Sequence, residues 1–167
     1  MHDTHAGNLD ASSLRIGIAI SRYHREVTDA LLAGATAAFT QAGGAEDRLH
    51  VVDAPGSWEL TAICRGMALL ETRLGKPMFD AIVALGCILT GETTHDQYLA
   101  QSITQGFTAI TVETGMPIAF GVLTCQTMEQ ARARSGASVN KGTEAMRAAI
   151  AAANALRDLQ HIDRSVR

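Results

Sequence analysis

The chain has 167 residues, of which 47% are hydrophobic, so it is long enough for one compact domain with a substantial core and too short for two ordinary domains. Its formal net charge is only −3 and its aromatic content is 4%, which leaves no basic stripe and no aromatic-rich basic face. Nucleic acid is therefore a poor candidate partner.

The cysteines and the chain start both bear on where the protein works. Cys64, Cys87 and Cys125 lie far apart, each within an apolar run, which indicates reduced, buried thiols rather than a disulfide framework or a zinc site. No apolar stretch reaches the roughly 20 residues that span a bilayer. Residues 1–5 have neither the basic start nor the apolar block of a signal peptide. We expect a cytoplasmic protein with no membrane partner.

The first third of the chain predicts an arm, two strands and one helix. Residues 1–14 have no periodicity and predict a flexible or swapped N-terminal arm. Short β-branched runs predict strands at 15–20 and 49–54. The helix between them ends at Gly43-Gly44. Its apolar positions recur at spacings of three and four: Val27, Leu31, Leu32, Ala35, Ala38 and Phe39.

The middle of the chain predicts a second helix over 58–74, ended by the glycine and proline that follow it. A third strand is predicted at 80–85, and a third helix over 94–114. The second helix is expected to bury one apolar face, made of Ile63, Met67, Leu70 and Leu74.

The last third predicts a strand at 117–125 and two helices. Thr127 and Gln130 have the spacing of a capping box, and Gly136 is expected to end that short helix. An alanine-rich helix over 143–160 follows, and a C-terminal tail over 161–167. The final helix is expected to pack three side chains inward: Met146, Ile150 and Leu156.

Strands that alternate with helices are typical of a parallel sheet covered on both faces. The predicted strands and helices together indicate an α/β fold, a three-layer α/β/α sandwich of flavodoxin-like type with a four-stranded parallel core sheet. We expect a single domain over 15–160, preceded by the arm and followed by the tail.

In such a sheet ligands bind beyond the carboxyl ends of the strands, so the loops at 21–24, 55–59 and 86–95 are the candidates. In the third loop, Thr93-Thr94 begin a helix whose free N–H groups suit an anion such as phosphate. The same positive end disfavours imidazolium, so we expect a neutral His95 that can accept or relay a proton. The alternative, a capping threonine and a surface histidine, stays open.

Tyr23 and Trp58 fall in adjacent loops, where aromatic walls could hold a planar ring while Glu59 accepts hydrogen bonds from a polyol. Packing of Trp58 at the start of its helix is the alternative. The chain has no G-x-G-x-x-G after the first strand, no P-loop, no G-x-S-x-G elbow and no clear metal-ligand spacing.

Taken in order, these loops resemble the signature of lumazine synthases. The chain has an Arg-aromatic pair after a strand, a P-G-x-x-E turn and L-G-x-x-x-x-G-x-T-x-H ending at His95. The similarity extends from about Gly7 to Leu156. Further matching segments are 117–124, Glu129-Gln130-Ala131 and Asn140-Lys141-Gly142.

The resemblance implies a binding site for a ribitylamino-uracil. Tyr23 matches the aromatic residue that stacks on the ring, and Phe120 matches a ring that reaches in from the neighbouring subunit. The remaining matches are the ribityl-binding turn and the stretch that lines the heterocycle: Ser57, Trp58, Glu59, Cys87, Ile88 and Leu89.

The resemblance also implies a site for the phosphate of the second substrate, a butanone phosphate. Glu92 and Thr93 match the phosphate-binding helix start, and Lys141 matches a basic residue near that phosphate. Arg134 matches a residue supplied by the neighbouring subunit, where its planar fork would bind two phosphate oxygens. His95 matches the residue that transfers protons.

The activity implied is that of a transferase in riboflavin biosynthesis, which needs no cofactor and no metal. It joins 5-amino-6-(D-ribitylamino)uracil to 3,4-dihydroxy-2-butanone 4-phosphate and gives 6,7-dimethyl-8-ribityllumazine. The family forms homopentamers, some of which assemble into icosahedral 60-mers, and riboflavin synthase is a candidate partner. The chain departs from the family pattern at Thr90, where arginine is usual, at His24, where asparagine is usual, and at Asp96-Gln97.

Two other functions stay open at this stage. An archaeal-type riboflavin synthase shares the fold but should lack the loop from Gly91 to His95. A non-catalytic flavin-binding or lumazine-binding shell protein is mildly favoured by Thr90, whereas His95 and Arg134 speak against it.

Overall fold

The computed structural model of the protein describes residues 7–165, with side chains described for 7–160. Its elements alternate along the chain as predicted. In order they are β1 (Ile16–Ser21), α1 (Arg25–Gln41), η1 (Glu46–Arg48), β2 (Leu49–Ala54), α2 (Leu60–Ala68), β3 (Ala81–Leu89), α3 (His95–Thr114), β4 (Ile118–Cys125), α4 (Met128–Ser135) and α5 (Lys141–Ser165).

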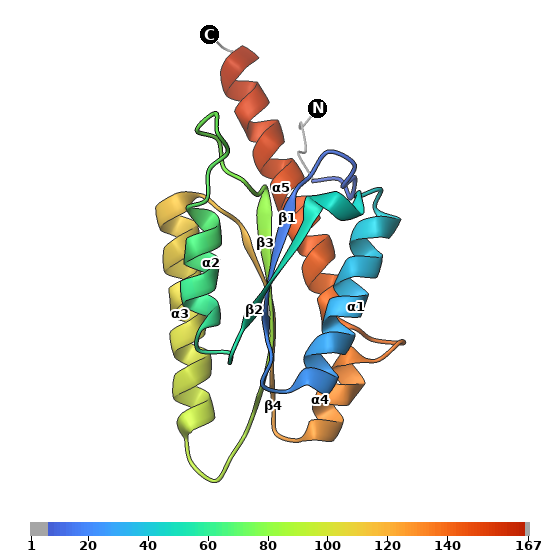
Figure 1. Ribbon diagram of the computed structural model, residues 1–167, viewed down its shortest axis with the longest axis vertical. Coiled ribbons are helices and arrows are strands. Elements are labelled where there is room, and N and C mark those ends of the chain that lie inside the picture. The colour runs from blue at the N-terminus through green and yellow to red at the C-terminus, as the bar shows by residue number, and fades with distance from the viewer. Residues whose placement is uncertain (1–6, 166–167) are drawn as a thin grey trace, which may run out of the picture.

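The four strands form one parallel sheet in the order β2-β1-β3-β4. Helices α2 and α3 cover one face, and α1, α4 and α5 cover the other (Figure 1). The predicted three-layer, flavodoxin-like architecture is confirmed. The carboxyl ends of the strands lie at the end of the sheet opposite residues 7–14 and the last turns of α5 (Figure 1).

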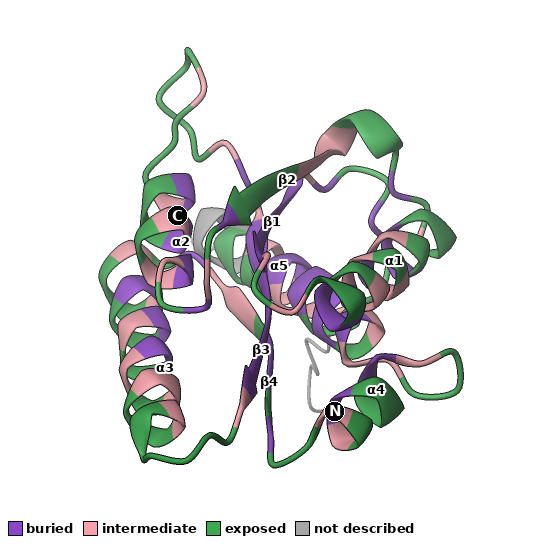
Figure 2. Ribbon diagram, turned by 60° about the horizontal axis from the view of Figure 1, so that its bottom comes forward, coloured by how far each residue is buried: buried purple, intermediate pink, exposed green. Residues whose placement is uncertain are grey.

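Two apolar clusters, one on each face of the sheet, hold the layers together. On one side Phe39 of α1 and Ile150 of α5 are fully buried, and on the other Leu60 of α2 and Ile103 of α3 are almost fully buried. Burial of each such side chain stabilises the fold by roughly 1.5–3 kcal/mol. The inner strands β1 and β3 are buried almost throughout, whereas β2 is largely exposed (Figure 2).

Strand β3 is longer than predicted. Residues 86–89, which the sequence analysis assigned to a loop, continue the strand because they pair with Val122, Leu123, Thr124 and Cys125 of β4. Cys87, Ile88 and Leu89 therefore have strand geometry, and the loop before α3 begins only at Thr90. This extension gives the candidate site a rigid floor.

Helix α2 is shorter than predicted and ends at Ala68, so the expectation that Leu70 and Leu74 face inward was wrong. Both side chains are exposed, Leu74 by 84%. The chain folds into a small turn instead. Thr72 N–H donates to Lys76 O at 2.7 Å, and Glu71 forms an isolated antiparallel β-bridge with Pro77. These backbone bonds replace the helical ones before the proline.

Helix α4 begins as predicted. Thr127 Oγ1 accepts from Gln130 N–H at 3.3 Å, while Gln130 Oε1 accepts from Gln126 N–H at 2.9 Å. The reciprocal bond thus reaches one residue further back than in a standard capping box. Gly136 is the C-cap, as expected.

Helix α5 starts at Lys141 and runs to Ser165, beyond the predicted bounds of 143 and 160. Asn140 Oδ1 accepts from the N–H groups of Gly142 and Thr143, which fixes the earlier start. Met146 and Ile150 are buried as predicted. Leu156 is 40% exposed, so its predicted inward packing was wrong.

The segment 7–14, predicted to belong to an arm, lies against α5 and α1 of its own chain. Ala11 and Leu14 are fully buried in the core. Asn154 Nδ2 donates to Asn8 O and Asp10 O at 3.0 and 2.9 Å. The remainder of the predicted arm, residues 1–6, and residues 166–167 of the predicted tail lie outside the described residues.

Candidate functional site

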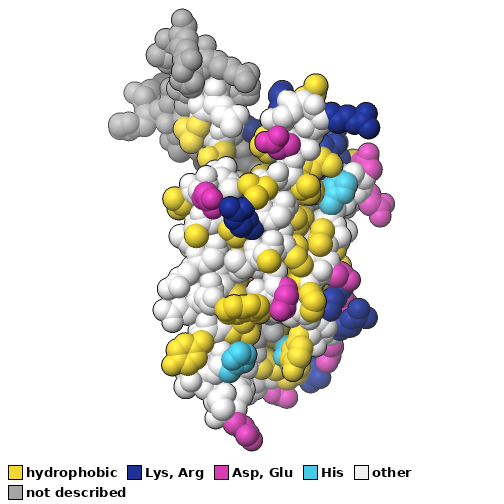
Figure 3. Space-filling view, turned by 60° about the vertical axis from the view of Figure 1, so that its left-hand side comes forward, with side chains coloured by type: hydrophobic (Ala, Val, Ile, Leu, Met, Phe, Trp, Pro, Cys, Tyr) yellow, Lys and Arg dark blue, Asp and Glu magenta, His cyan; other side chains and the backbone are white. Residues whose placement is uncertain are grey.

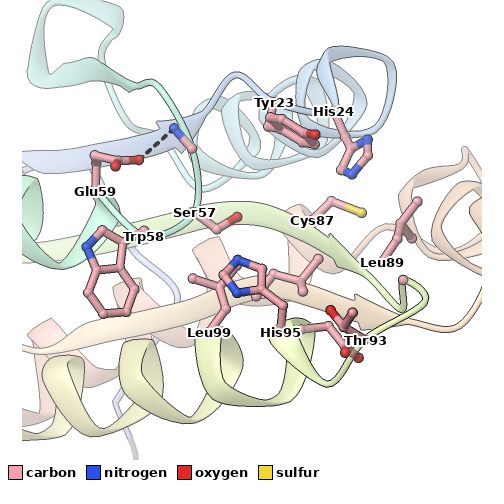
Figure 4. A pocket seen from close by; sticks show the side chains of 14 residues that line it. Tyr23, His24, Ser57, Trp58, Glu59, Cys87, Leu89, Thr93, His95 and Leu99 are labelled. Carbon is pink, nitrogen blue, oxygen red and sulfur yellow. Dashed lines mark hydrogen bonds between the residues drawn. The ribbon is translucent and has the colours of Figure 1, made fainter.

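A cavity of about 570 Å³ lies at the carboxyl ends of β1, β2 and β3, where the fold predicts a ligand site. We call it the main cavity. Tyr23 and His24 form one side of it and His95 and Thr93 the opposite side, with Ser57 and Cys87 between them (Figure 4). Its lining residues are Tyr23, His24, Gly56, Ser57, Trp58, Glu59, Cys87, Ile88, Leu89, Gly91, Thr93, His95, Asp96 and Leu99.

The turn between β1 and α1 presents Tyr23. Arg22, just before it, forms ion pairs with Asp29 at 2.5 Å and Asp53 at 2.6 Å. The hydrogen bond from Arg22 holds the pKa of Asp53 below its usual range. Tyr23 is 76% exposed and meets His24 edge-on, with ring centroids 4.9 Å apart. The ion pairs anchor the turn while the Tyr23 ring remains free to contact a ligand.

The turn between β2 and α2 is closed by its own carboxylate. Glu59 Oε2 accepts from Gly56 N–H at 3.0 Å, the dashed line in Figure 4. Ser57 is buried beneath this turn. Trp58 is 60% exposed and lines the main cavity, so it does not pack into the core at the start of α2. The turn offers an indole face and the second oxygen of Glu59 to a ligand.

The end of β3 forms the floor of the main cavity. Cys87 and Ile88 are buried there, and Leu89 is partly exposed. Burial, with a smaller effect of Cys125, raises the pKa of the Cys87 thiol to about 11. Cys87 is therefore a neutral, weakly polar wall at physiological pH rather than a thiolate nucleophile. All three cysteines are free and buried, as predicted.

The start of α3 supplies the remaining wall. Thr94 is the N-cap but makes no side-chain cap bond, and the next residue, His95, opens the helix. Its first N–H groups thus have no capping side chain, which favours an anion there. Thr93 and His95 line the main cavity. Glu92 is exposed and lines neither this cavity nor the hollow described next.

A separate hollow of about 480 Å³, here called the edge hollow, lies beside β4, α4 and α5. It contains Phe120, Arg134 and Lys141, none of which lines the main cavity. Arg134 Nη1 donates to Gln130 O at 3.0 Å, and Lys141 Nζ pairs with Glu144 at 2.6 Å. Both cations are at the surface, so they can reach a group outside this chain.

Nine of the predicted site residues thus line the main cavity and three line the edge hollow. Five further residues line the main cavity: His24, Gly56 and Gly91 lie in the predicted loops but had no role assigned, and Asp96 and Leu99 lie beyond those loops. Leu99 could have been found, because it lies four residues after His95 and so on the same helix face. Asp96 could not have been found from the sequence, because its burial and contacts depend on where β3 ends.

Within residues 7–160, whose side chains the structure describes, no group of three or more His, Cys, Asp and Glu side chains is placed to hold a metal ion. None of the helices in that part of the chain is long and apolar enough to cross a membrane.

Comparison with known proteins identifies a family for this chain. The sequence model of 6,7-dimethyl-8-ribityllumazine synthase matches residues 13–157. The protein of that name from Saccharopolyspora erythraea is 42% identical over 153 residues, which cover 90% of this chain and 87% of the relative. The protein of that name from Streptomyces coelicolor is 42% identical over 153 residues, which cover 90% of this chain and 89% of the relative. A relative from Anaeromyxobacter sp. is 37% identical over 157 residues, with 93% of each chain covered.

Proposed function

The chain belongs to the 6,7-dimethyl-8-ribityllumazine synthase family, and from that premise we propose how it acts. Its substrates are 5-amino-6-(D-ribitylamino)uracil and 3,4-dihydroxy-2-butanone 4-phosphate, and the reaction is the transferase step of riboflavin biosynthesis that the family name denotes. The observation that carries this proposal is the gathering of Tyr23, Glu59 and His95 around one cavity.

The main cavity fits a flat, uncharged heterocycle with a polyol chain. In our proposal the pyrimidine ring of the amine stacks on Tyr23 and lies against Cys87, Ile88 and Leu89. The ribityl hydroxyls donate to the free oxygen of Glu59 and contact the turn that holds Ser57 and Trp58. Aromatic and aliphatic walls with one carboxylate give affinity and orientation together.

The phosphate of the second substrate needs cations, which the main cavity lacks. We propose that it binds at the start of α3, near Glu92 and Thr93, and that Arg134 and Lys141 of a neighbouring subunit neutralise it. Phe120 of the neighbour then covers the pyrimidine ring. In support, Phe120 is 48% exposed and Arg134 is at the surface, as side chains that serve another chain would be.

In this mechanism the 5-amino nitrogen of the uracil attacks the carbonyl carbon of the ketone. The adduct loses water to form an imine, phosphate is then eliminated, and ring closure by the ribitylamino nitrogen releases a second water. His95 accepts and returns the protons that these steps move. Because the amine is already nucleophilic, holding the two substrates in line supplies most of the acceleration, up to ~7–11 kcal/mol in ideal cases. Proton transfer adds typically ~100-fold or more. The reaction requires no cofactor.

We also propose that the working form is an oligomer, because the proposed site needs a neighbour, and that it is the homopentamer that the family resemblance implies. The outer face of α3 is a candidate contact surface. It is nearly uncharged, with Val112 81% exposed, and few charges lie over the middle of this side (Figure 3). In the family a longer insertion between the last two helices goes with free pentamers, so the short connection at 135–139 leads us to propose a 60-subunit shell in the cytoplasm, with riboflavin synthase as a candidate partner. Light scattering tests this, and the mass of only five subunits would exclude the shell.

The direct experiment is to mix the purified protein with both substrates and follow lumazine formation by absorbance, after subtraction of the uncatalysed rate. We expect protein-dependent product that falls when Arg134 is replaced. No rate above background, with tight lumazine binding retained, would contradict the synthase and favour a non-catalytic binder.

A further inference from the structure

The segment that carries His95 is poorly held by the rest of the chain. Residues 91–95 lead from Thr90, the first residue after β3, into the first residue of α3, and all five are exposed. Gly91, Glu92 and Thr93 make no hydrogen bond to any other described residue, and Thr94 is held only through its carbonyl oxygen, which accepts from the N–H groups of Gln97 and Tyr98 at 3.1 and 3.4 Å. The Thr93 and His95 side chains nevertheless line the main cavity. A segment of this kind needs some contact that keeps it in one conformation.

One contact closes the segment from end to end. Thr90 Oγ1, on the last residue before it, donates to Asp96 Oδ2, on the first residue after it, at 3.1 Å. We call this pair the loop clasp. Thr90 is itself fixed, because its N–H donates to Cys125 O of β4 at 2.9 Å. The clasp therefore ties the first turn of α3 to the sheet edge, next to His95.

The surroundings of Asp96 suit a fixed carboxylate. Its side chain is partly buried and lies between the main cavity and a neighbouring hollow of about 470 Å³, which Thr90 also lines. Its other oxygen, Oδ1, is buried and has no hydrogen-bond partner among the described residues. The Thr90 hydroxyl is thus the contact that orients this carboxylate. Its position in the first turn of α3 also places a negative charge where the helix dipole favours one.

From this geometry we infer that Thr90 and Asp96 are positioning residues for the reaction, which hold residues 91–95 so that His95 and Thr93 face the main cavity. The inference rests on the proposed function. The clasp acts on the proton-transfer group and on the start of α3, so its loss lowers kcat. Loss of the clasp leaves the amine subsite, which is built from Tyr23 and the turn at Glu59, unchanged.

The test compares Thr90→Val, which removes the hydroxyl at nearly constant shape, with Thr90→Ser, which keeps it. Thr90 is exposed, so neither change disturbs the core, and circular dichroism with thermal unfolding checks this. We expect Thr90→Val to lower kcat about five- to tenfold, the range for loss of one hydrogen bond at a partly solvated site. KM for the amine should stay unchanged, and Thr90→Ser should remain within about twofold of wild type.

A cycle with His95 separates positioning from general stabilisation. If the clasp acts through His95, Thr90→Val added to His95→Ala causes little further loss of kcat, because the group to be positioned is gone. Asp96→Ala should behave as Thr90→Val does, and combining these two should cost no more than either alone.

Failure of the loop clasp and failure of the proposed function would give different results. An inactive wild-type enzyme would remove the proposed function, and the inference with it. An active wild-type enzyme with unchanged kcat in Thr90→Val, or a Thr90→Val loss that is just as large in the His95→Ala background, would overturn the loop clasp and leave the synthase assignment intact.

Discussion

The main cavity and the edge hollow differ in charge. Among the described residues, no Lys or Arg lines the main cavity, which instead contains the carboxylates of Glu59 and Asp96. The edge hollow contains two cations, Arg134 and Lys141, and one carboxylate, Glu144, which pairs with Lys141. A phosphate ester needs cationic donors, whereas a neutral heterocycle needs aromatic and aliphatic walls. Under the proposed function, the two hollows of one chain therefore suit different substrates, the edge hollow the phosphate ester and the main cavity the heterocycle.

The largest effect should come from removing the Arg134 guanidinium of the edge hollow. Arg134→Ala should raise KM for the butanone phosphate about 100-fold or more, because a charged partner of the phosphate is lost. KM for the amine should change little. Steady-state kinetics with each substrate varied in turn would measure both values.

Arg132 provides a matched control on the same helix. Its guanidinium pairs with Glu26 at 2.7 Å and does not line the edge hollow. Arg132→Ala should therefore leave both KM values close to wild type. Equal losses in the two arginine variants would mean that charge on α4, rather than the specific place of Arg134, governs phosphate binding.

In the main cavity the largest effect should come from His95. His95→Ala should lower kcat about 100-fold and leave measurable turnover, because the cavity still aligns the substrates. His24→Asn, on the opposite wall, should change kcat by less than about threefold, since our mechanism moves no proton there. Single-turnover rates of the two variants would compare them. Unchanged turnover in His95→Ala would remove the assigned role.

The smallest effect should come from Cys87. Because burial raises its pKa to about 11, the thiol is neutral across the working range. Cys87→Ala should keep kcat within about threefold of wild type, with the same pH profile, since a neutral thiol contributes packing rather than chemistry. A kinetic pKa that disappears in Cys87→Ala would show that the thiol takes part.

The raised pKa of Cys87 also predicts that the protein becomes less stable at high pH. The folded pKa of Cys87 lies above that of an unfolded thiol, about 8.5. Its contribution to stability is therefore complete below about pH 8.5 and lost as the pH rises towards 11. Between these values the free energy of unfolding should fall more steeply in wild type than in Cys87→Ala, as denaturant titrations would measure.

Much of the fold could be predicted because its signals are local. The β-branched runs at β1 and β2 and the apolar spacing of Val27, Leu31 and Ala35 define those elements without reference to the rest of the chain. The end of β3 could not be predicted, because residues 86–89 are strand only by virtue of pairing with β4. The early end of α2 likewise depends on the turn bonds from Thr72 to Lys76.

The main cavity was predictable for a topological reason. Parallel strands bring their carboxyl ends together, so the loops with Tyr23, Glu59 and His95 had to meet. The proposal that Phe120 and Arg134 act in the site of a neighbouring subunit came only from the resemblance, because the spacing of residues in one chain does not indicate which of them act in another. The clasp between Thr90 and Asp96 required side-chain geometry that periodicity does not contain.

The most direct test of the two-subunit site is to co-express Arg134→Ala and His95→Ala chains with different tags and to assay the purified mixed assemblies. If each site takes His95 from one subunit and Arg134 from its neighbour, random mixing in a closed ring restores about a quarter of the sites to wild-type composition. Activity should then rise to about a quarter of wild type, far above either parent. Activity no higher than the mean of the two parents would contradict the account.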